Sequence, residues 1–251
     1  MRLIPPREIL RRIWPSDGKI ANPELAPPAY AARHQDATFI VFGNGPSLAE
    51  NLDAIHALGE KFNAVTMGAN NIGEILAPDY HAFTNRKRFA AYSSGIDPVR
   101  TRVLLSPYFT DGFIRKHYTG PYEQIMYRAD NDAPFDIQNG IIQASCRTVA
   151  VLMIAVAVVM GARRIFVAGT DGYKGHLDSG RHVHFYDGDF GQKDNDGAQA
   201  KQERFLLELE RYNARFMDEI SAYMRERGLD PFTIVTPTVH TRHYRPIGEY
   251  L

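Results

Sequence analysis

Short apolar runs alternate along the chain with segments whose apolar residues recur every three or four positions. The runs predict buried strands, and the recurring positions predict amphipathic helices. The first strand is expected at 39–42, before a helix at 48–58, and a later helix from about 145 to 160 precedes a strand at 164–169. Strands that alternate with helices are typical of parallel sheets. The pattern therefore predicts an α/β, Rossmann-like fold: a mostly parallel sheet with helices on both faces.

Further segments extend this pattern. Additional strands are expected at 62–68, 80–84, 102–105 and 232–236. A long helix is expected at 198–227, and its predicted buried side comprises Phe205, Leu206, Leu209, Tyr212, Phe216, Ile220 and Tyr223. The aromatic-rich segment 108–135 shows neither period and is expected to be irregular.

Two segments lack the pattern. The segment 172–197 is rich in Gly, Asp and His, and because long segments of this kind are usually functional, we expect a lid over a site. Residues 1–37 contain basic, apolar and proline-rich stretches. We expect an N-terminal arm and strap at 1–37 and a single nucleotide-binding catalytic domain at 38–251.

Charge and cysteine content narrow the function classes. Lys and Arg together number 29, as do Asp and Glu, which argues against a general polyanion binder, so no nucleic-acid partner is expected. Cys146 is the single cysteine and is expected to be buried and inert. A chain without an internal disulfide fits the reducing cytoplasm.

Two segments have the apolar character that membrane contact requires. The apolar run 149–160 is shorter than the roughly 20 residues that a membrane span requires. The basic and apolar residues 1–14 fit an interfacial helix at the inner face of a membrane. They equally fit an arm that packs on the body or on a second subunit of a homo-oligomer.

The most distinctive motif is the turn Gly43-Asn44-Gly45-Pro46-Ser47, which follows the first strand and precedes a helix. Glycines let a backbone approach a ligand closely, Ser47 is a typical helix cap, and a helix N-terminus favours phosphate. The spacing matches neither the dinucleotide fingerprint nor the phosphate loop. We expect a nucleotide-type ligand, with an ordinary strand-to-helix turn as the alternative.

Polar side chains follow other strands as well. They are Asn70 and Asn71, Asn85, and Asp171. Because the carboxyl ends of parallel strands share one edge, these side chains are expected to converge with Asn44 on one ligand crevice. Asp171 equally fits a turn cap.

The basic residues Arg86, Lys87 and Arg88 follow the strand at 80–84. Basic side chains there suit a phosphate or an acidic substrate, with a solvated surface run as the alternative.

The expected lid contains residues suited to proton transfer. His182 and His184 are two positions apart, so an extended segment places both on one side. Together with Asp187, the two histidines suit a transition-metal site. Alternatively, one imidazole acts as a general base. A third alternative is that these are polar loop residues without a special role. Tyr173 and Tyr186 suit donation to a leaving phosphate, or packing.

Taken together, these motifs resemble the small bacterial sialyltransferases. They are the turn 43–48, the Asn70-Asn71 strand end, Asn85, the apolar helix leading into 161–173, and the late strand 235–237, and they span most of residues 38–245. The resemblance implies a CMP-activated sugar and no metal or other cofactor. The chain departs from the family pattern in a shorter lid and in the start of the apolar helix, 145–147.

The resemblance also implies site residues. It puts the nucleotide on the first turn and on the strand-end asparagines Asn44, Asn70 or Asn71, and Asn85. The full set that we predict to bind the nucleotide is Gly43, Asn44, Gly45, Pro46, Ser47, Asn70, Asn71, Asn85, Ser145 and Asp171. The catalytic residues that the resemblance implies are His184 or His182 as base on the acceptor hydroxyl, and Tyr173 on the leaving phosphate. We add Tyr186 from its place in the expected lid, as a second donor.

The turn and the segment ending at Asp171 also resemble the hydroxymethyl-dihydropterin diphosphokinase-like proteins. That resemblance implies Mg²⁺ on Asp171 and a second carboxylate, and pyrophosphoryl transfer from ATP to a pterin alcohol. A third alternative is a nucleotide-binding protein without catalysis. We favour a metal-independent glycosyltransferase that moves a sialic-acid-like sugar from a CMP- or other nucleotide-activated donor to a small glycan or other hydroxyl acceptor.

Overall fold

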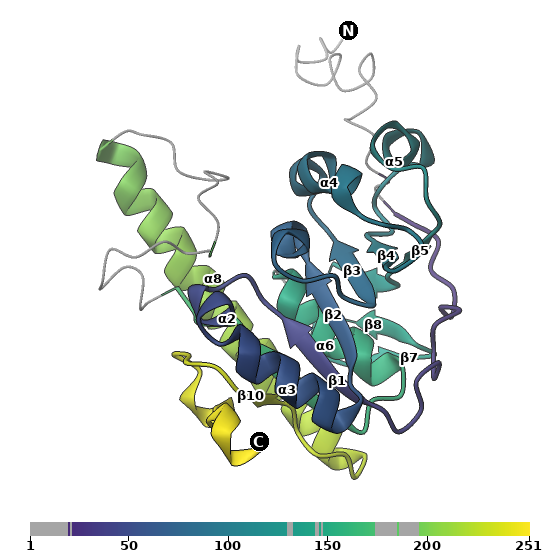
Figure 1. Ribbon diagram of the computed structural model, residues 1–251. Coiled ribbons are helices and arrows are strands. Elements are labelled where there is room, and N and C mark those ends of the chain that lie inside the picture. Colours follow the sequence, from purple (N-terminus) through teal and green to yellow (C-terminus); the bar gives the residue numbers. More distant parts are fainter. Residues whose placement is uncertain are drawn as a thin grey trace, which may run out of the picture.

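The fold is built around one parallel sheet (Figure 1). The computed structural model describes residues 20, 22–129, 133–143, 146, 148–173, 185 and 196–251. Seven strands lie in the order β10-β9-β1-β2-β3-β4-β5, and every pair is parallel. The strands are β1 (Thr38–Phe42), β2 (Val65–Ala69), β3 (Tyr80–Phe83), β4 (Arg102–Leu105), β5 (Tyr122–Gln124), β9 (Arg164–Ala168) and β10 (Thr233–Ile234). The predicted α/β, Rossmann-like fold class is confirmed.

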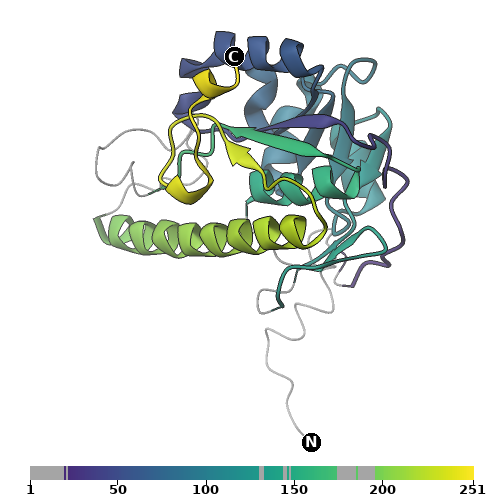
Figure 2. The same cartoon turned by 90° about the horizontal axis from the view of Figure 1, so that it is seen from below.

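Helices cover both faces of the sheet (Figure 2). One face carries α2 (Pro46–Glu50) and α3 (Leu52–Phe62), and the other carries α6 (Val149–Val159) and α8 (Asp196–Glu226). The remaining described elements are α4 (Arg86–Tyr92), α5 (Asp111–His117), four 3-10 turns, η1 (Asn70–Glu74), η2 (Ser93–Gly95), η3 (Thr241–His243) and η4 (Ile247–Glu249), and a small sheet of β6 (Tyr127–Arg128), β8 (Ile141–Gln143) and β7 (Ile137–Gln138).

The largest core lies between the sheet, α6 and α8. The α6 sequence is apolar around its whole circumference, because its residues pack against strands on one side and against α8 residues such as Phe216 and Ile220 on the other. On the opposite face, Ile55 and Leu58 of α3 pack on Ile40. Within the described residues, no helix combines the length and apolar character needed to cross a membrane.

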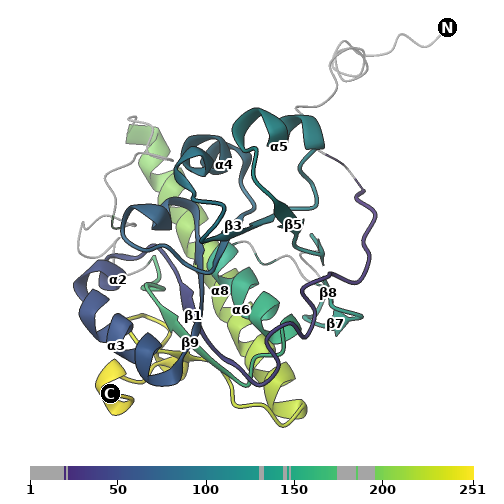
Figure 3. The ribbon, with the colours of Figure 1, turned by 45° about the vertical axis from the view of Figure 1, so that its right-hand side comes forward.

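The segment before β1 runs along the side of the molecule (purple in Figure 3). Tyr30 is fully buried, its hydroxyl accepts from the backbone N–H of Met126 at 3.3 Å, and the N–H of Ala32 donates to Val159 at 2.9 Å. These contacts fit a strap. Residues 1–19, most of the expected arm, lie outside the described residues, and the division after residue 37 stays a prediction.

Several predicted elements differ from those observed. The expected helix 48–58 is two helices, because Asn51 leaves helical geometry and its side-chain amide donates to the Ser47 carbonyl at 2.8 Å. The pattern did not predict α4 or α5, whose seven residues each are too short for a clear helical period. Phe205 is 54% exposed rather than buried, since the first half of α8 extends beyond the sheet (Figure 2).

The sheet reverses its strand order at β1. The chain continues from β1 to β2 on one side, whereas β9 flanks the other side, so the turns after β1 and β9 meet at a topological switch point. The N–H of Gly43 donates to Ala168 and that of Gly45 to Gly169, both at 2.8 Å. A Cβ on Gly43 would overlap the Gly169 carbonyl oxygen. The glycines of the turn thus allow close contact between two loops.

Replacing Gly43 tests this contact. We expect Gly43→Ala to lower the free energy of unfolding by about 2 to 3 kcal/mol, because the added methyl group must displace backbone atoms. Gly112→Ala is the control, since a Cβ there meets nothing within 4 Å and should change stability by less than about 1 kcal/mol. Urea unfolding measures both, and equal effects would contradict the prediction.

Candidate functional site at the carboxyl edge of the sheet

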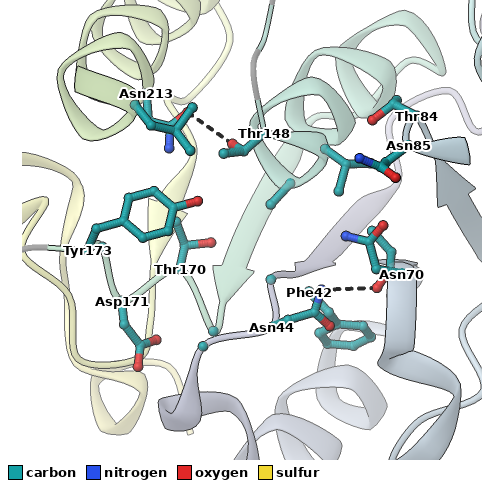
Figure 4. Close-up of a pocket in the computed structure, with 18 of the residues that line it drawn as sticks. Phe42, Asn44, Asn70, Thr84, Asn85, Thr148, Thr170, Asp171, Tyr173 and Asn213 are labelled. Atoms are coloured by element: carbon teal, nitrogen blue, oxygen red, sulfur yellow. Dashed lines mark hydrogen bonds between the residues drawn. The ribbon is translucent and has the colours of Figure 1, made fainter. Parts of the chain in front are cut away.

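A cavity of about 470 Å³ opens where the turns after β1, β2, β3 and β9 face α6 and α8 (Figure 4). Its described lining residues are Phe42, Gly43, Asn44, Gly45, Ala69, Asn70, Thr84, Asn85, Arg88, Thr148, Val149, Ala150, Gly169, Thr170, Asp171, Gly172, Tyr173, Phe205, Leu209, Asn213 and His240. The carboxyl edge at a switch point is the usual ligand position in open α/β sheets.

Most predicted site residues within the described part of the chain meet at this cavity. Gly43, Asn44, Gly45, Asn70, Asn85, Asp171 and Tyr173 line it. Pro46 and Ser47 do not, and Asn71 lines a second cavity, of about 340 Å³, that shares Asn70. The predicted residues Ser145, His182, His184 and Tyr186, with Asp187, lie outside the described residues. Of the predicted lid, the described residues are Gly172, Tyr173, Phe185 and the first two residues of α8.

Asn44 presents an unsatisfied acceptor. Its side chain is 8% exposed, and its Nδ2 donates to the Ala69 carbonyl at 3.1 Å (Figure 4). Its Oδ1 is buried and accepts no hydrogen bond from any described residue. A buried carbonyl oxygen without a donor costs about 1 to 3 kcal/mol.

Asn70 is held by a histidine that the sequence pattern did not single out. Asn70 has a left-handed backbone, with φ of 56°, and is 3% exposed. Nε2 of His81 lies 2.8 Å from the Asn70 carbonyl oxygen, and because a carbonyl only accepts, Nε2 carries the proton. The sequence feature that could have identified His81 is its position as a polar residue inside the fully buried strand β3. His81 thereby fixes a conformation that few residues other than Gly and Asn adopt.

Asn85 is the N-cap of α4. Its Oδ1 accepts from the N–H groups of Lys87 at 2.9 Å and Arg88 at 3.2 Å. The carbonyl oxygen is therefore committed to the helix, and the amide nitrogen is the group left for a ligand. The three basic residues separate: Arg88 lines the cavity, the Arg86 guanidinium lies 4.1 Å above the Phe113 ring, and Lys87 is exposed.

Asp171 caps the turn after β1 from a distant part of the chain. Its carboxylate accepts from the N–H of Ser47 at 3.0 Å and from the Ser47 hydroxyl. The expected Ser47 cap is wrong, because Gly45 is the N-cap of α2 and no side-chain cap bond is present. The expected phosphate position at this helix is also overturned, since Pro46 has no N–H, Ser47 donates to Asp171, and Leu48 donates to Gly45.

The loop after β10 fixes the segment that carries Tyr173. The Thr236 hydroxyl accepts from Gly169 N–H at 2.9 Å, and the Thr238 hydroxyl donates to the Thr170 carbonyl at 2.6 Å. The N–H of Tyr173 donates to Glu210 of α8 at 2.6 Å. Figure 4 shows the Tyr173 hydroxyl directed into the cavity. This tyrosine is therefore placed to contact a bound group.

Thr148 and Asn213 are site residues that the sequence pattern did not predict. The Thr148 hydroxyl donates to Asn213 Oδ1 at 3.0 Å across the gap between α6 and α8 (Figure 4). Thr148 precedes a wholly apolar helix, and Asn213 is a buried polar residue on the packed side of α8. The sequence feature that could have identified Asn213 is its position as a polar residue on an otherwise apolar helix face.

Among the described residues, the lining of the cavity offers no second carboxylate for the Mg²⁺ alternative. Asp171 is the single carboxylate among the described lining residues, and both its oxygens accept from Ser47. No group of three His, Cys, Asp or Glu side chains in the described part of the chain could hold a metal ion.

Burial raises the pKa of the Cys146 thiol to about 12, which agrees with the expected inert thiol.

Comparisons with known proteins give two structural matches. No protein-family model and no curated protein matches the chain. The MAf glycosyltransferase from Magnetospirillum magneticum AMB-1 matches 61% of this chain at 16% identity and a TM-score of 0.44. This chain spans about a quarter of that protein, since the match covers 26% of its length.

The second structure is the sialyltransferase CstII from Campylobacter jejuni, solved in complex with the substrate analogue cytidine-5′-monophosphate. It matches 85% of this chain and 86% of its own at 12% identity and a TM-score of 0.48. This match agrees with the resemblance stated from the motifs. At these identities and TM-scores the likeness concerns the fold and adds no argument about activity.

His81 gives stability a pH dependence. Burial lowers its pKa to about 4, whereas an unfolded histidine titrates near 6.5. As the pH falls, the unfolded chain therefore takes up a proton on His81 before the folded protein does. The stability that neutral His81 contributes is fully present above pH 6.5 and is lost as the pH falls toward 4. The loss reaches about 3 kcal/mol.

Urea unfolding between pH 4 and 7 measures this effect. We expect His81→Asn to flatten the pH dependence of the unfolding free energy in this window, whatever its effect at neutral pH. His56→Asn, on the exposed side of α3, is the control for the substitution itself. The same steep loss in His81→Asn as in the wild type would contradict the assignment.

Proposed function

We propose that this protein is a glycosyltransferase that moves a sialic-acid-like sugar from a CMP- or other nucleotide-activated donor to a hydroxyl acceptor. The reaction would use a histidine base and no metal ion. The observation that carries the proposal is the set of three asparagines, Asn44, Asn70 and Asn85, that line one cavity at the switch point of the sheet. Such a cavity suits a ligand that offers both donors and acceptors on a planar edge.

The edge of a cytosine base has this character. Its exocyclic amine is a donor, and its ring carbonyl and ring nitrogen are acceptors. Asn44 Oδ1 supplies the acceptor for the amine, and the Asn85 amide nitrogen, whose carbonyl oxygen is used by α4, supplies a donor. Asn70 lies between them in Figure 4. The wall with these three asparagines, here called the amide wall, would hold the nucleoside.

The leaving phosphate gains negative charge as the sugar departs. Arg88 lines the cavity next to Asn85, and the Tyr173 hydroxyl points into it from the other side. A cation and a preorganised hydroxyl donor stabilise charge that develops in the transition state. The acceptor oxygen bonds to the anomeric carbon, the bond from that carbon to the phosphate oxygen breaks, and its electron pair leaves with the nucleoside monophosphate.

The acceptor hydroxyl must lose its proton during this step. By resemblance to the small bacterial sialyltransferases, the proton passes to His184 or His182. Phe185, which follows His184 in the sequence, donates its N–H to the Asn44 carbonyl oxygen at 2.9 Å. This contact supports the proposal, because it ties a described residue of the predicted lid to the edge of the cavity.

A thermal-shift panel of CMP, CDP, UDP, GDP and ATP, each with and without Mg²⁺, tests the nucleotide. We expect CMP without metal to raise the melting temperature, by about 5 °C or more at a hundredfold excess over Kd, because only the native state binds it. Asn44→Ala should weaken CMP binding about tenfold or more. Asn71→Ala, in the second cavity, is the matched control and should bind CMP normally. Stabilisation by ATP and Mg²⁺ alone would favour the diphosphokinase instead.

Tyr173→Phe tests the leaving-group contact. We expect turnover to fall about 10- to 100-fold, because one hydroxyl donor to the departing phosphate is lost. The CMP-induced thermal shift should remain, since the aromatic ring and the backbone bond to Glu210 are kept. Initial rates of CMP release measure the change, and full activity would show that the hydroxyl only packs.

A further inference from the structure

The side of the cavity opposite the amide wall comes from α8, the start of α6 and the loop after β10. Five of its described residues matter here: Thr148, Phe205, Leu209, Asn213 and His240. In Figure 4, Asn213 and Thr148 lie across the cavity from Asn70 and Asn85. The proposed nucleotide uses none of these five residues, which together are here called the α8 wall.

Asn213 presents a hydrogen-bond donor to the cavity. Its side chain is 5% exposed, and its Oδ1 is fixed by the Thr148 hydroxyl at 3.0 Å. Figure 4 shows its amide nitrogen directed toward the cavity. No described residue accepts a hydrogen bond from this nitrogen. An amide N–H that faces a cavity is satisfied when a ligand supplies the acceptor.

His240 presents a second buried polar group. It is 8% exposed, and its ring makes no hydrogen bond to the described residues. Its position is fixed by the backbone: its own N–H donates to the Thr238 hydroxyl at 3.1 Å, and the N–H of Val239 donates to Asp171 at 2.9 Å. Burial lowers the pKa of His240, although the Glu210 carboxylate acts in the opposite direction. A neutral imidazole both donates and accepts.

Apart from Thr148, whose hydroxyl is bonded to Asn213, the rest of the α8 wall is apolar. Phe205 is 54% exposed and stands with Leu209 on the part of α8 that extends beyond the sheet. No charged side chain belongs to the described part of this wall. Two fixed hydrogen-bonding groups beside apolar surface suit a molecule with hydroxyl groups and apolar C–H faces. A phosphate or carboxylate would find no cation here among the described residues.

We propose that the α8 wall is the acceptor subsite and that it binds a neutral sugar, whose hydroxyl groups pair with Asn213 and His240 while a C–H face packs on Phe205. This inference rests on the proposed function, which puts the nucleotide on the amide wall and the reacting bond between the two walls. Asn213 and His240 would thereby determine acceptor affinity and not donor affinity.

Saturation-transfer NMR on the whole 251-residue chain with CMP present tests the subsite. The probes are neutral mono- and disaccharides together with their phosphorylated and carboxylated counterparts. We expect a neutral sugar to bind, and Asn213→Ala and His240→Ala each to weaken it about tenfold, the effect of one lost hydrogen bond of about 1.4 kcal/mol. His240→Gln, which keeps a donor and an acceptor, should recover part of the loss.

His243→Ala is the matched control. His243 is three positions from His240, but it bonds Asp218 at 3.1 Å and stacks on Phe232, outside the cavity. It should leave sugar binding unchanged, and every variant should keep the CMP-induced thermal shift. Preference for anionic probes, absence of sugar binding, or unchanged binding in both Asn213→Ala and His240→Ala would overturn the subsite.

The outcomes separate the two proposals. CMP binding without any effect of the α8 wall overturns the subsite and leaves the proposed function standing. Loss of the CMP shift in Asn213→Ala or His240→Ala assigns the wall to the donor and again overturns the subsite alone. If neither CMP nor any other nucleotide of the panel binds the wild type, the proposed function fails, and with it the acceptor assignment, even if sugars bind the wall.

Discussion

The site depends on the contact between the turn after β1 and the loop after β9. The Asp171 carboxylate accepts from both the backbone and the hydroxyl of Ser47, and Gly43 packs directly against the Gly169 carbonyl. Segments more than a hundred positions apart in the sequence are thereby held at hydrogen-bond distance. The carboxylate ends up as a structural group, although a carboxylate after a strand suggests ligand or metal binding.

This contact leaves a cavity with two chemically different sides. The amide wall offers Asn44, Asn70 and Asn85, each with part of its hydrogen-bonding capacity already used by the protein. The α8 wall offers Asn213 and His240 beside apolar surface. Tyr173 reaches into the space between them (Figure 4). In the proposed reaction, the nucleotide donor would lie on one side of this space and the acceptor on the other.

The asparagines at the strand ends have different structural roles. Asn85 caps a helix, Asn44 donates to a neighbouring strand, and Asn70 is held in a left-handed turn by His81. Asn71, the immediate neighbour of Asn70, lines another cavity. Proximity to the carboxyl edge was predictable from the strand pattern. The direction of each side chain was not, because it depends on hydrogen bonds to segments far away in the chain.

The sequence by itself determined the parallel sheet, the buried α6 helix and the edge at which polar residues gather. Burial periodicity is local, so a short window of residues records it. Only the tertiary structure decided that Ser47 and Asp171 satisfy each other, that Asn44 keeps an unpaired oxygen, and that Asn213 and His240 face the same cavity. Those outcomes depend on which distant segments meet, and a local pattern of apolar and polar residues does not encode the partner of a hydrogen bond.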